Sequence, residues 1–432
     1  MNRITTLAID TSCDETSASV VDYLTVLSNI QPSQMEYHKK FGGVVPNLAR
    51  LAHQERIDNV VDEALRKAKK SIEEIEFFAV TIGPGLAIAL EVGILKAKEL
   101  ATKYNKPLIT INHMEGHLLS CFAKPSTIAT NRTDLAIVAN SSVPALGLLV
   151  SGGHTEFIFT NKIGTYEKIG ETLDDSCGEC LDKCGRILGL GYPAGPIISK
   201  FAKEHRRKVK LSLERRNASL YISAENKETG SKYELPVGMA FTNDLNVSYS
   251  GLKTAFRSLV ETIITQNTNS FSSQAENKLQ QDIETAKRLT KIQILDLCVL
   301  VEAAAYKPLE IKLEKFLSGM EKGDHKSVNK SYKVKEVWLG GGVVASARLR
   351  HLIRKIAKKY EVKFRFPYTK KLTTDNAAMI GVAANFRIYR NYNVLNKLKY
   401  SQSDLKFLLQ QGIYISSKEF ITIDRDPGLE LK

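Results

Sequence analysis

Residues 145–160 read ALGLLVSGGHTEFIFT, in which an apolar run, a glycine turn and a second strand-like run follow one another. Residues 7–21, LAIDTSCDETSASVV, have the same form, with a polar tip between an apolar run and a return strand. The two stretches share a pattern rather than their residues. Strand and helix signals alternate after each hairpin, which predicts a parallel or mixed sheet covered by helices. The sequence therefore predicts a duplicated α/β fold.

The elements expected around the two hairpins divide the chain into two lobes. Strand signals lie at 76–82, 106–111 and 363–367, helix signals at 44–68 and 373–389, and a glycine turn opens a helix within 83–104 and within 334–360. We expect an N-terminal lobe at 1–142 and a C-terminal lobe at 143–432. The second lobe should include a polar, strand-prone excursion at about 206–236 and a helical insertion at about 250–320.

The composition is that of a globular protein without a membrane span. The 432 residues are 43% hydrophobic and 25% charged, and this length favours two or three domains. No apolar run reaches the roughly 18 residues that a membrane helix needs. The start, MNRITTLAID, enters a strand-like run at once, which leaves no room for a signal or transit peptide. Six cysteines in this length indicate reduced thiols, so we expect a cytoplasmic protein.

The charge balance favours a polyanionic partner. The chain has 61 Lys and Arg against 47 Asp and Glu, a net charge of +14. Basic residues cluster at 204–216, 322–335 and 348–360. Such an excess is typical of nucleic-acid binding, although solvated helices and loops give the same composition. No aromatic RNA-binding motif accompanies the clusters.

Two histidines stand four residues apart after an apolar strand, in INHMEGHLL at 111–119. On a helix, His113 and His117 share one face and can bind one metal ion, or can lie there without a metal. The zinc protease motif has the order H-E-x-x-H, whereas this chain has H-M-E-G-H, which disfavours a protease. Asp375, in LTTDNAAM, could complete a site of two histidines and one carboxylate. Its alternative role is to cap the helix that follows.

Glycine-rich turns at strand ends are a second candidate for binding chemistry. Glycine lets backbone N–H groups approach a phosphate closely. Three such turns lie at 83–85, 151–153 and 340–342. Since neither a P-loop nor a dinucleotide-binding motif is present, each turn alone is weak evidence, but together they favour a nucleotide cleft.

Three cysteines lie close together in DDSCGECLDKCGRILGL. Cys177, Cys180 and Cys184 could bind an iron–sulfur cluster, but their order of spacing is the reverse of the radical-enzyme motif. They also share one helix face, as small core residues do. We therefore expect them to be packing residues.

Nine ordered segments resemble a single family from end to end. They are LAIDTSCDETSASVVD, FGGVVPNLA, TIGPGLAIALEVG, NKPLITINHMEGHLLS, LLVSGGHTEFI, GETLDDSCGECLDKCGRILGLGYPAGP, VSYSGLKT, GGGVVASARLR and TTDNAAMIG. The chain resembles the tRNA threonylcarbamoyladenosine transferases, the TsaD type of the actin-like ATPase superfamily. The resemblance implies a duplicated actin-like ATPase (ribonuclease H-like) fold with two lobes around a central cleft. It also implies transfer of threonylcarbamoyl from threonylcarbamoyl-adenylate to the exocyclic amine of adenosine 37 in tRNAs reading codons that begin with A, with release of AMP.

The same resemblance implies roles for individual residues. The metal ligands would be His113, His117 and Asp375. The substrate-binding residues would be Leu149, Val150, Ser151, Gly152, Gly153, Asp182, Gly195 and Ser346. The family usually has Asn where this chain has Ser346, and Gly where it has Ala194. Archaeal and eukaryotic members tend to have a metal-ligating Tyr where this chain has Leu149, so the resemblance is to the bacterial or organellar type. The lack of room for a transit peptide favours the bacterial type.

The resemblance further implies a cofactor and partners. We expect one divalent metal ion per subunit, Fe²⁺ in preference to Zn²⁺. The expected partners are tRNA, threonylcarbamoyl-adenylate or AMP, a shorter paralogous scaffold of the TsaB type and a small P-loop ATPase of the TsaE type. No side chain is an obvious general base; Asp14 and Glu15 are the nearest candidates.

Two other functions are compatible with parts of the sequence. A sugar or acetate kinase of the same superfamily would place ATP in the cleft, but it would not need the histidine pair. A catalytically idle scaffold would dimerise with an active partner, but it would not need the full set of His113, His117 and Asp375.

Overall fold

The first sheet is built around the hairpin at residues 7–21. A computed structural model of the protein describes residues 4–32, 45–267, 287–322, 333–397 and 399–432. Strands β1 (Thr5–Asp10), β2 (Ser17–Asp22) and β3 (Thr25–Ile30) are antiparallel, and β4 (Phe77–Gly83) and β5 (Leu108–Asn112) add to β1 in parallel. The order is β3-β2-β1-β4-β5, with the short strands β6 (Lys124–Pro125) and β15 (Ile413–Tyr414) at its edges.

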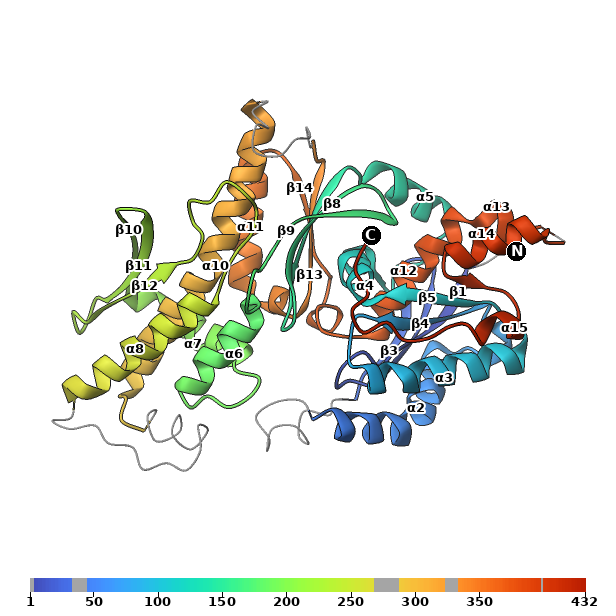
Figure 1. Ribbon diagram of the computed structural model, residues 1–432, viewed down its shortest axis with the longest axis horizontal. Helices are drawn as coiled ribbons and strands as arrows, with labels where there is room; N and C mark the ends of the chain where they lie inside the picture. Colours follow the sequence, from blue (N-terminus) through green and yellow to red (C-terminus); the bar gives the residue numbers. More distant parts are fainter. Residues whose placement is uncertain (1–3, 33–44, 268–286, 323–332, 398) are drawn as a thin grey trace.

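The second sheet repeats this arrangement. Strands β7 (Ala145–Val150), β8 (Thr155–Lys162) and β9 (Thr165–Glu171) are antiparallel, and β13 (Glu336–Gly340) and β14 (Lys363–Arg365) add to β7 in parallel. The order β9-β8-β7-β13-β14 therefore matches the first sheet in both sequence and direction. This topology confirms the predicted duplicated, actin-like α/β fold, and Figure 1 shows the two sheets in separate lobes.

The central strand of the first sheet is buried on both faces. Leu7 and Ile9 point into the core that α2 (Pro46–Ala68) and α3 (Ala87–Tyr104) form with the sheet. Ala8, between them, points to the opposite face, where α12 (Ala377–Arg390) packs. Successive side chains of a strand point to opposite faces. Burial on both sides therefore explains why this stretch reads as an apolar run without polar alternation.

The helix-rich part of the chain lies between β9 and β13. Its elements are α6 (Cys177–Ile187), α7 (Gly195–His205), β10 (Val209–Arg216), β11 (Ser219–Asn226), β12 (Lys232–Val237), α8 (Ser250–Asn267) and α10 (Lys291–Lys322). The segment expected to be strand-prone forms the antiparallel sheet β10-β11-β12. Residues 268–286 of the expected helical insertion lie outside the described residues. This whole segment occupies the place in the second unit that α2 occupies in the first.

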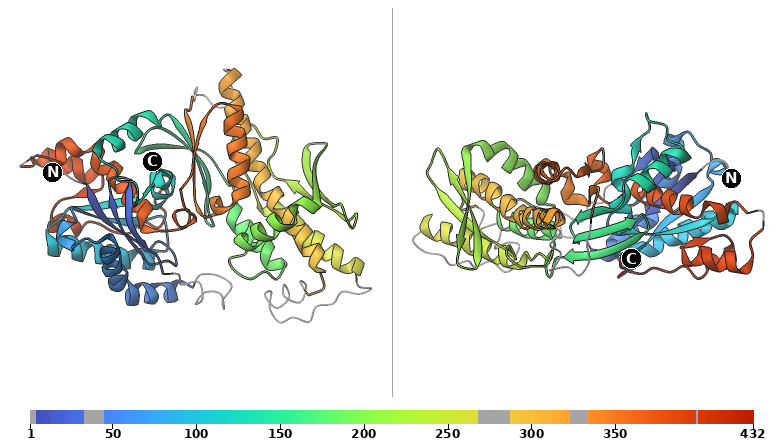
Figure 2. Two further views of the ribbon diagram at one scale, coloured as in Figure 1. Left: turned by 180° about the vertical axis from the view of Figure 1, so that it is seen from behind. Right: turned by 90° about the horizontal axis from the view of Figure 1, so that it is seen from above.

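The end of the chain returns to the first sheet. α12 packs against β1 and β2, and β15 pairs with β5. Almost every side chain of α12 is buried, because this helix lies between the sheet and the neighbouring helix α4 (His113–Leu119). We expected the second lobe to run to residue 432. The boundary at 142 and 143 stays a prediction, but this last segment lies with the first sheet, as Figure 2 shows.

Shorter elements complete the described chain. They are α5 (Arg132–Ser141), α11 (Ala347–Lys359), α13 (Tyr392–Leu395), α14 (Gln402–Gln410), α15 (Ser417–Phe420) and the 3-10 turns η1 (Ile72–Glu74), η2 (Ser120–Phe122), η3 (Arg206–Lys208), η4 (Gly342–Ala345) and η5 (Lys370–Leu372). Among the described helices, none combines the length and the apolar character that crossing a membrane requires.

Candidate metal centre and substrate cleft

Helix α4 holds the two histidines at the end of β5. Asn112 caps this helix, because its side chain accepts hydrogen bonds from the backbone N–H groups of Met114 (2.8 Å) and Glu115 (3.3 Å). His113 and His117 are consequently one turn apart and lie on the same side of the helix. Their ring centroids are 4.6 Å apart at an interplanar angle of 85°, and both rings are buried.

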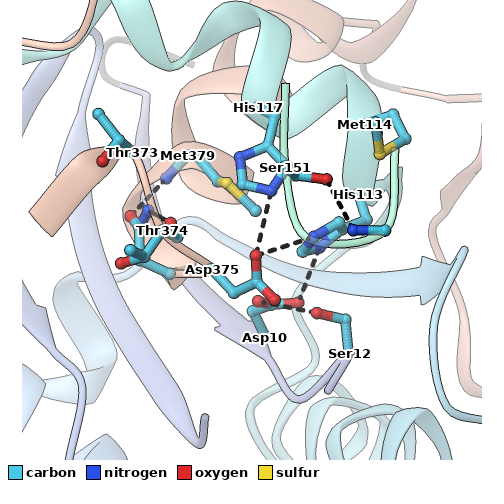
Figure 3. A network of polar contacts seen from close by, with 12 residues as sticks. Asp10, Ser12, His113, Met114, His117, Ser151, Thr373, Thr374, Asp375 and Met379 are labelled. Atoms are coloured by element: carbon cyan, nitrogen blue, oxygen red, sulfur yellow. Dashed lines mark hydrogen bonds and ion pairs between the residues drawn. The ribbon is translucent and has the colours of Figure 1, made fainter. Parts of the chain in front are cut away.

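Asp375 reaches the histidines from the segment before α12. Its Oδ1 atom lies 3.1 Å from Nε2 of His117 and 3.3 Å from Nε2 of His113 (Figure 3). The alternative role of Asp375 as a helix cap is wrong. Asn376 caps α12 instead, with its side chain accepting from the N–H of Met379 at 3.2 Å. The carboxylate of Asp375 is therefore left to face the histidines.

The donor atoms of these three residues fit one divalent metal ion. They lie within 4.8 Å of one another, and no other group of three His, Cys, Asp or Glu side chains in the described ranges is arranged in this way. In each histidine the Nε2 atom faces Oδ1 of Asp375. Two imidazoles with a carboxylate are a common donor set for transition metals.

Asp10 is a fourth member of the site that the sequence analysis missed. It ends β1, is fully buried, and places Oδ1 3.6 Å from Nδ1 of His113. Ser12 donates a hydrogen bond to its other oxygen at 3.3 Å. A carboxylate behind a metal-binding histidine orients the ring. The available signal was its position, because the ends of the parallel strands β1 and β5 meet at one edge of the sheet.

The charges of the site depend on one another. Burial lowers the pKa of His113, but the carboxylates of Asp375 and Asp10 outweigh burial and raise this pKa to about 10. Burial lowers the pKa of His117. Burial also acts to raise the pKa of Asp375, but His113 and His117 hold it well below its usual value. Without metal, the cluster therefore keeps a proton on His113, and a metal ion has to displace that proton.

Glu15 lies at the rim of the cluster. The side chain of Gln31 donates hydrogen bonds both to the Glu15 carboxylate and to the backbone carbonyl of Asp375, the latter at 2.6 Å. Burial, together with the negative charges of Asp375 and Asp14, raises the pKa of Glu15 to about 8. Of the two candidate bases, Glu15 is thus connected through Gln31 to the segment that contains Asp375.

The predicted substrate loop is the turn between β7 and β8. Leu149 and Val150 lie in β7, between β13 and β8, and both residues are fully buried. The N–H of Ser151 donates to the carbonyl of His154 at 2.8 Å, and its Oγ accepts from the N–H of His154 at 2.9 Å. At Gly152 and Gly153 an added Cβ would meet no atom within 4 Å. The backbone of this turn is therefore accessible.

Gly178 holds this turn in place and was not singled out by the sequence analysis. Its N–H donates to the carbonyl of Ser151 at 3.2 Å, and Ser176 donates to the carbonyl of Gly152 at 2.7 Å. A Cβ on Gly178 would lie 2.5 Å from the Ser151 carbonyl oxygen. The start of α6 can approach the turn this closely only because residue 178 lacks a side chain.

Of the remaining predicted substrate residues, the structure places two in direct contact. Asp182, on α6, accepts hydrogen bonds from the N–H groups of Ala194 (2.7 Å) and Gly195 (2.8 Å) and so caps α7. Ser346 caps α11, accepting from the N–H of Leu349 at 3.4 Å, and lies 3.5 Å from a carboxylate oxygen of Glu302. The turn η4, just before Ser346, contacts α6 and α7. All three residues therefore lie in the same part of the second lobe.

Comparison with known proteins identifies the family. The family model described as TsaD, tRNA N6-adenosine threonylcarbamoyltransferase, matches residues 25–382. The chain belongs to this family. The tRNA N6-adenosine threonylcarbamoyltransferase of Carboxydothermus hydrogenoformans is 36% identical over 382 residues, covering 88% of this chain and 91% of that protein. The protein of the same name from Pelagibacter ubique is 34% identical over 381 residues, covering 87% of each chain.

A solved structure gives a much weaker similarity. YeaZ from Pseudomonas aeruginosa aligns with 38% of this TsaD-family chain and 67% of its own, at 14% identity and a TM-score of 0.24.

The glutamate between the histidines of this TsaD-family chain points away from the metal donors. Glu115 is buried and pairs with Nη2 of Arg387 on α12 at 2.5 Å. Its second oxygen accepts from the hydroxyl of Tyr166 on β9 at 3.0 Å. Glu115, whose position between the histidines disfavoured a protease, thus connects α4 to α12 and to the second sheet.

The three neighbouring cysteines are packing residues, as predicted. Cys177, Cys180 and Cys184 are fully buried in the core of the second lobe. Two of the thiols lie close to backbone carbonyls, Cys177 to Ala305 (3.8 Å) and Cys180 to Tyr249 (3.7 Å). Burial raises the pKa of Cys177, which disfavours the thiolate that an iron–sulfur cluster requires.

Proposed function

We propose that this protein transfers the threonylcarbamoyl group of threonylcarbamoyl-adenylate to the exocyclic amine of adenosine 37 in tRNAs that read codons beginning with A, releasing AMP. The observation that carries the proposal is the convergence of His113, His117 and Asp375 in a member of the TsaD family. Neither a kinase nor an idle scaffold would require this donor set.

The reaction exchanges one bond for another. The adenosine amine nitrogen forms a bond to the carbamoyl carbon, and the bond from that carbon to the phosphate oxygen breaks. AMP leaves with the electron pair, and the amine loses one proton. A divalent cation held by His113, His117 and Asp375 would stabilise negative charge on the carbamoyl and phosphate oxygens. We propose Fe²⁺ over Zn²⁺, because two histidines and one carboxylate typically hold iron with open positions.

The protein's own residues would bind and orient the adenylate. The turn at Ser151, Gly152 and Gly153 leaves its backbone open to the phosphate or carbamoyl oxygens. Asp182, Gly195 and Ser346 would contact the adenosine part, with Leu149 and Val150 contributing backbone atoms. Ser346 keeps a short polar group in place of the usual amide, and Glu302 lies beside it. Asp10 would orient His113.

We also propose the surroundings that the family resemblance implies. These are a cytoplasmic location, a shorter scaffold paralogue of the TsaB type and a small P-loop ATPase of the TsaE type.

The direct test is nucleoside mass spectrometry of tRNA. Purified protein, with the two partner proteins present, is incubated with threonylcarbamoyl-adenylate and unmodified tRNA, and threonylcarbamoyladenosine and AMP are quantified. We expect equal amounts of both products with wild type. We expect loss of both with His113→Ala, whose fold is checked by circular dichroism. Full activity of His113→Ala would contradict the role of the metal site, and absence of product with wild type would contradict the proposed function.

A further inference from the structure

Most of the net positive charge of the protein comes from one short segment. Residues 347–371 contain ten Lys and Arg and one acidic residue, Glu361, a net charge of +9 out of +14 for the whole chain. The segment comprises α11, β14 and η5 and leads directly to Asp375. A field this concentrated attracts polyanions more strongly than the same charge spread over the surface.

These cations have few acidic neighbours. Within the described ranges, Lys359 pairs with Glu314 and Arg365 with Glu336, and no other Lys or Arg of the segment has a carboxylate oxygen within 4.0 Å. Arg354, Lys370 and Lys371 are exposed. Their charge is therefore available to an external anion.

The basic cluster predicted at 204–216 differs in this respect, and most of the cluster predicted at 322–335 lies outside the described residues. Residues 206–237, which form η3 and the sheet β10-β11-β12, contain eight Lys and Arg but also four Glu. Arg216 pairs with both Glu214 and Glu234, and Lys208 pairs with Glu228. Part of the positive charge is thus neutralised within the sheet, which makes it the weaker anion surface.

Two arginines of α11 are held in place by aromatic rings. The guanidinium groups of Arg350 and Arg354 lie 5.2 Å and 5.4 Å from the ring centroid of Phe366, and Arg350 donates to the carbonyl of Val344 at 3.0 Å. Burial and the positive charge of Arg354 lower the pKa of Arg350. The two groups therefore repel each other, and phosphate oxygens between or beside them would relieve this repulsion.

The segment borders the metal centre. β14 runs parallel to β13 and β7, so it ends at the same edge of the sheet as Gly340 and the turn at Ser151. Figure 1 shows α11 and β14 beside this sheet. From Arg365 the chain reaches Asp375 in ten residues, passing Tyr368, whose side chain is 46% exposed, and η5. An exposed ring among cations suits stacking with an unpaired base.

We propose that Arg350, Arg354, Tyr368, Lys370 and Lys371 form the surface on which the anticodon arm of the acceptor tRNA docks. This inference rests on the proposed tRNA transfer. Phosphate contacts fix the register of an RNA without reading its sequence. Cations on the segment that ends at Asp375 would bring an unstacked loop base to the metal centre. The protein would then select those tRNAs whose unstacked loop base can extend as far as the metal centre.

The test reverses three charges on the proposed docking surface and, as a control, three charges on η3 and the sheet β10-β11-β12. The first variant is Arg354→Glu, Lys370→Glu, Lys371→Glu. The matched control, Arg207→Glu, Lys210→Glu, Lys232→Glu, replaces one exposed Arg and two exposed Lys as well. Binding of fluorescently labelled tRNA is measured against salt concentration, and binding of AMP is measured separately.

We expect the first variant to bind tRNA at least about tenfold more weakly than the control. Its log–log salt slope should become shallower by about two, since each lost phosphate contact removes about 0.7 to 0.9. AMP binding should be unchanged in both. Equal tRNA affinity of the two variants, a larger loss in the control, or no tRNA binding by wild type at about 50 mM salt would overturn the docking surface. If wild type binds tRNA but forms no threonylcarbamoyladenosine, the proposed function fails instead.

Discussion

At the scale of residues, the site depends on a few side chains whose neighbours come from distant parts of the sequence. His113 and His117 are related by helical spacing, and Asp375 and Asp10 come from two other segments. Removing one of the three donor side chains leaves the other two in a buried environment without the third ligand. This makes the metal content of single variants informative.

We predict that His113→Ala combined with His117→Ala abolishes the binding of one metal ion per chain. Two of the three donors are lost, and one carboxylate alone holds a transition metal weakly. Elemental analysis of purified protein measures the change. His351→Ala, on the exposed face of α11, is the control and should keep the metal. Equal metal content in all three proteins would show that the ion binds elsewhere.

Glu115 should be important for stability. Glu115→Ala leaves Arg387 partly buried without its partner, which costs about 3 kcal/mol of the free energy of unfolding. Tyr166→Phe removes only one hydrogen bond to the same carboxylate and should cost about 1 kcal/mol. Urea denaturation of both variants measures these costs. A smaller loss in Glu115→Ala than in Tyr166→Phe would mean that the ion pair contributes little.

How well the role of each of these residues can be predicted from the sequence depends on whether its partners are near in the chain. The spacing of His113 and His117 is local, so a helix can be anticipated from it. Asp375 and Asn376 can both cap a helix, and the local sequence does not show which of them does so. The structure shows that Asn376 is the cap, which leaves Asp375 to face the histidines. Asp10 could not be connected to His113 without the strand order. The roles of Asp182, Gly195 and Ser346 in substrate binding stay predictions.

At the scale of elements, the start of α6 and the turn after β7 act as one unit. Gly178→Ala should lower the free energy of unfolding by about 1–2 kcal/mol, because two backbone segments have to separate. The better helix propensity of alanine offsets only about 1 kcal/mol of this cost. Gly152→Ala, where no atom lies near the added methyl group, should change the free energy of unfolding by less than about 0.5 kcal/mol. Urea denaturation compares the two, and equal stabilities would contradict the close approach.

Asp174 should give α8 a pH-dependent contribution to stability. Its carboxylate accepts hydrogen bonds from the N–H groups of Tyr249 and Ser250 and from the hydroxyls of Ser248 and Ser250. Burial acts to raise the pKa of Asp174, but these hydrogen bonds lower it below its usual 3.8. The folded state therefore binds the proton more weakly, so the stabilisation is present above pH 3.8 and lost as pH falls through the folded pKa.

Asp174→Asn should accordingly cost no more than about 1 kcal/mol near neutral pH, because the group is partly exposed. The difference from wild type should shrink below pH 3.8. Urea denaturation at several pH values measures it, with Asp62→Asn on the exposed side of α2 as the control. A difference that stays constant with pH would rule out the charged form as its source.

At the scale of the whole molecule, the two units were predictable but the path of the chain from α12 onward was not. The duplication can be recognised locally, because the hairpins at 7–21 and 145–160 share the same pattern of apolar run, turn and return strand. The return of α12 and β15 to the first sheet depends on contacts between residues more than 300 positions apart, such as that of Asn385 with Thr6. No local periodicity encodes the partner of a helix that is apolar on nearly every side.

The segment after β15 should contribute to the metal centre from a distance. The side chain of Asn112, which caps α4, donates to the carbonyls of Leu429 and Glu430, each at 3.2 Å. The N–H of Asp426 donates to the carbonyl of Ile82 at 2.7 Å. Deleting residues 425–432 should weaken metal binding, because the cap of α4 loses these contacts. Metal titration of the shortened chain tests this, with the double variant His113→Ala, His117→Ala as the reference for complete loss. Unchanged affinity would show that the segment is dispensable.

The return of α12 also has a consequence during protein synthesis. The first strands of this sheet leave the ribosome early, yet α12, which packs on one face of the sheet, is complete only once Arg390 has been added. Until then, Ala8 and its neighbours on that face lack this helix, and His113 and His117 lack Asp375. A nascent chain of this protein therefore cannot assemble its metal site before nearly all of it has been translated.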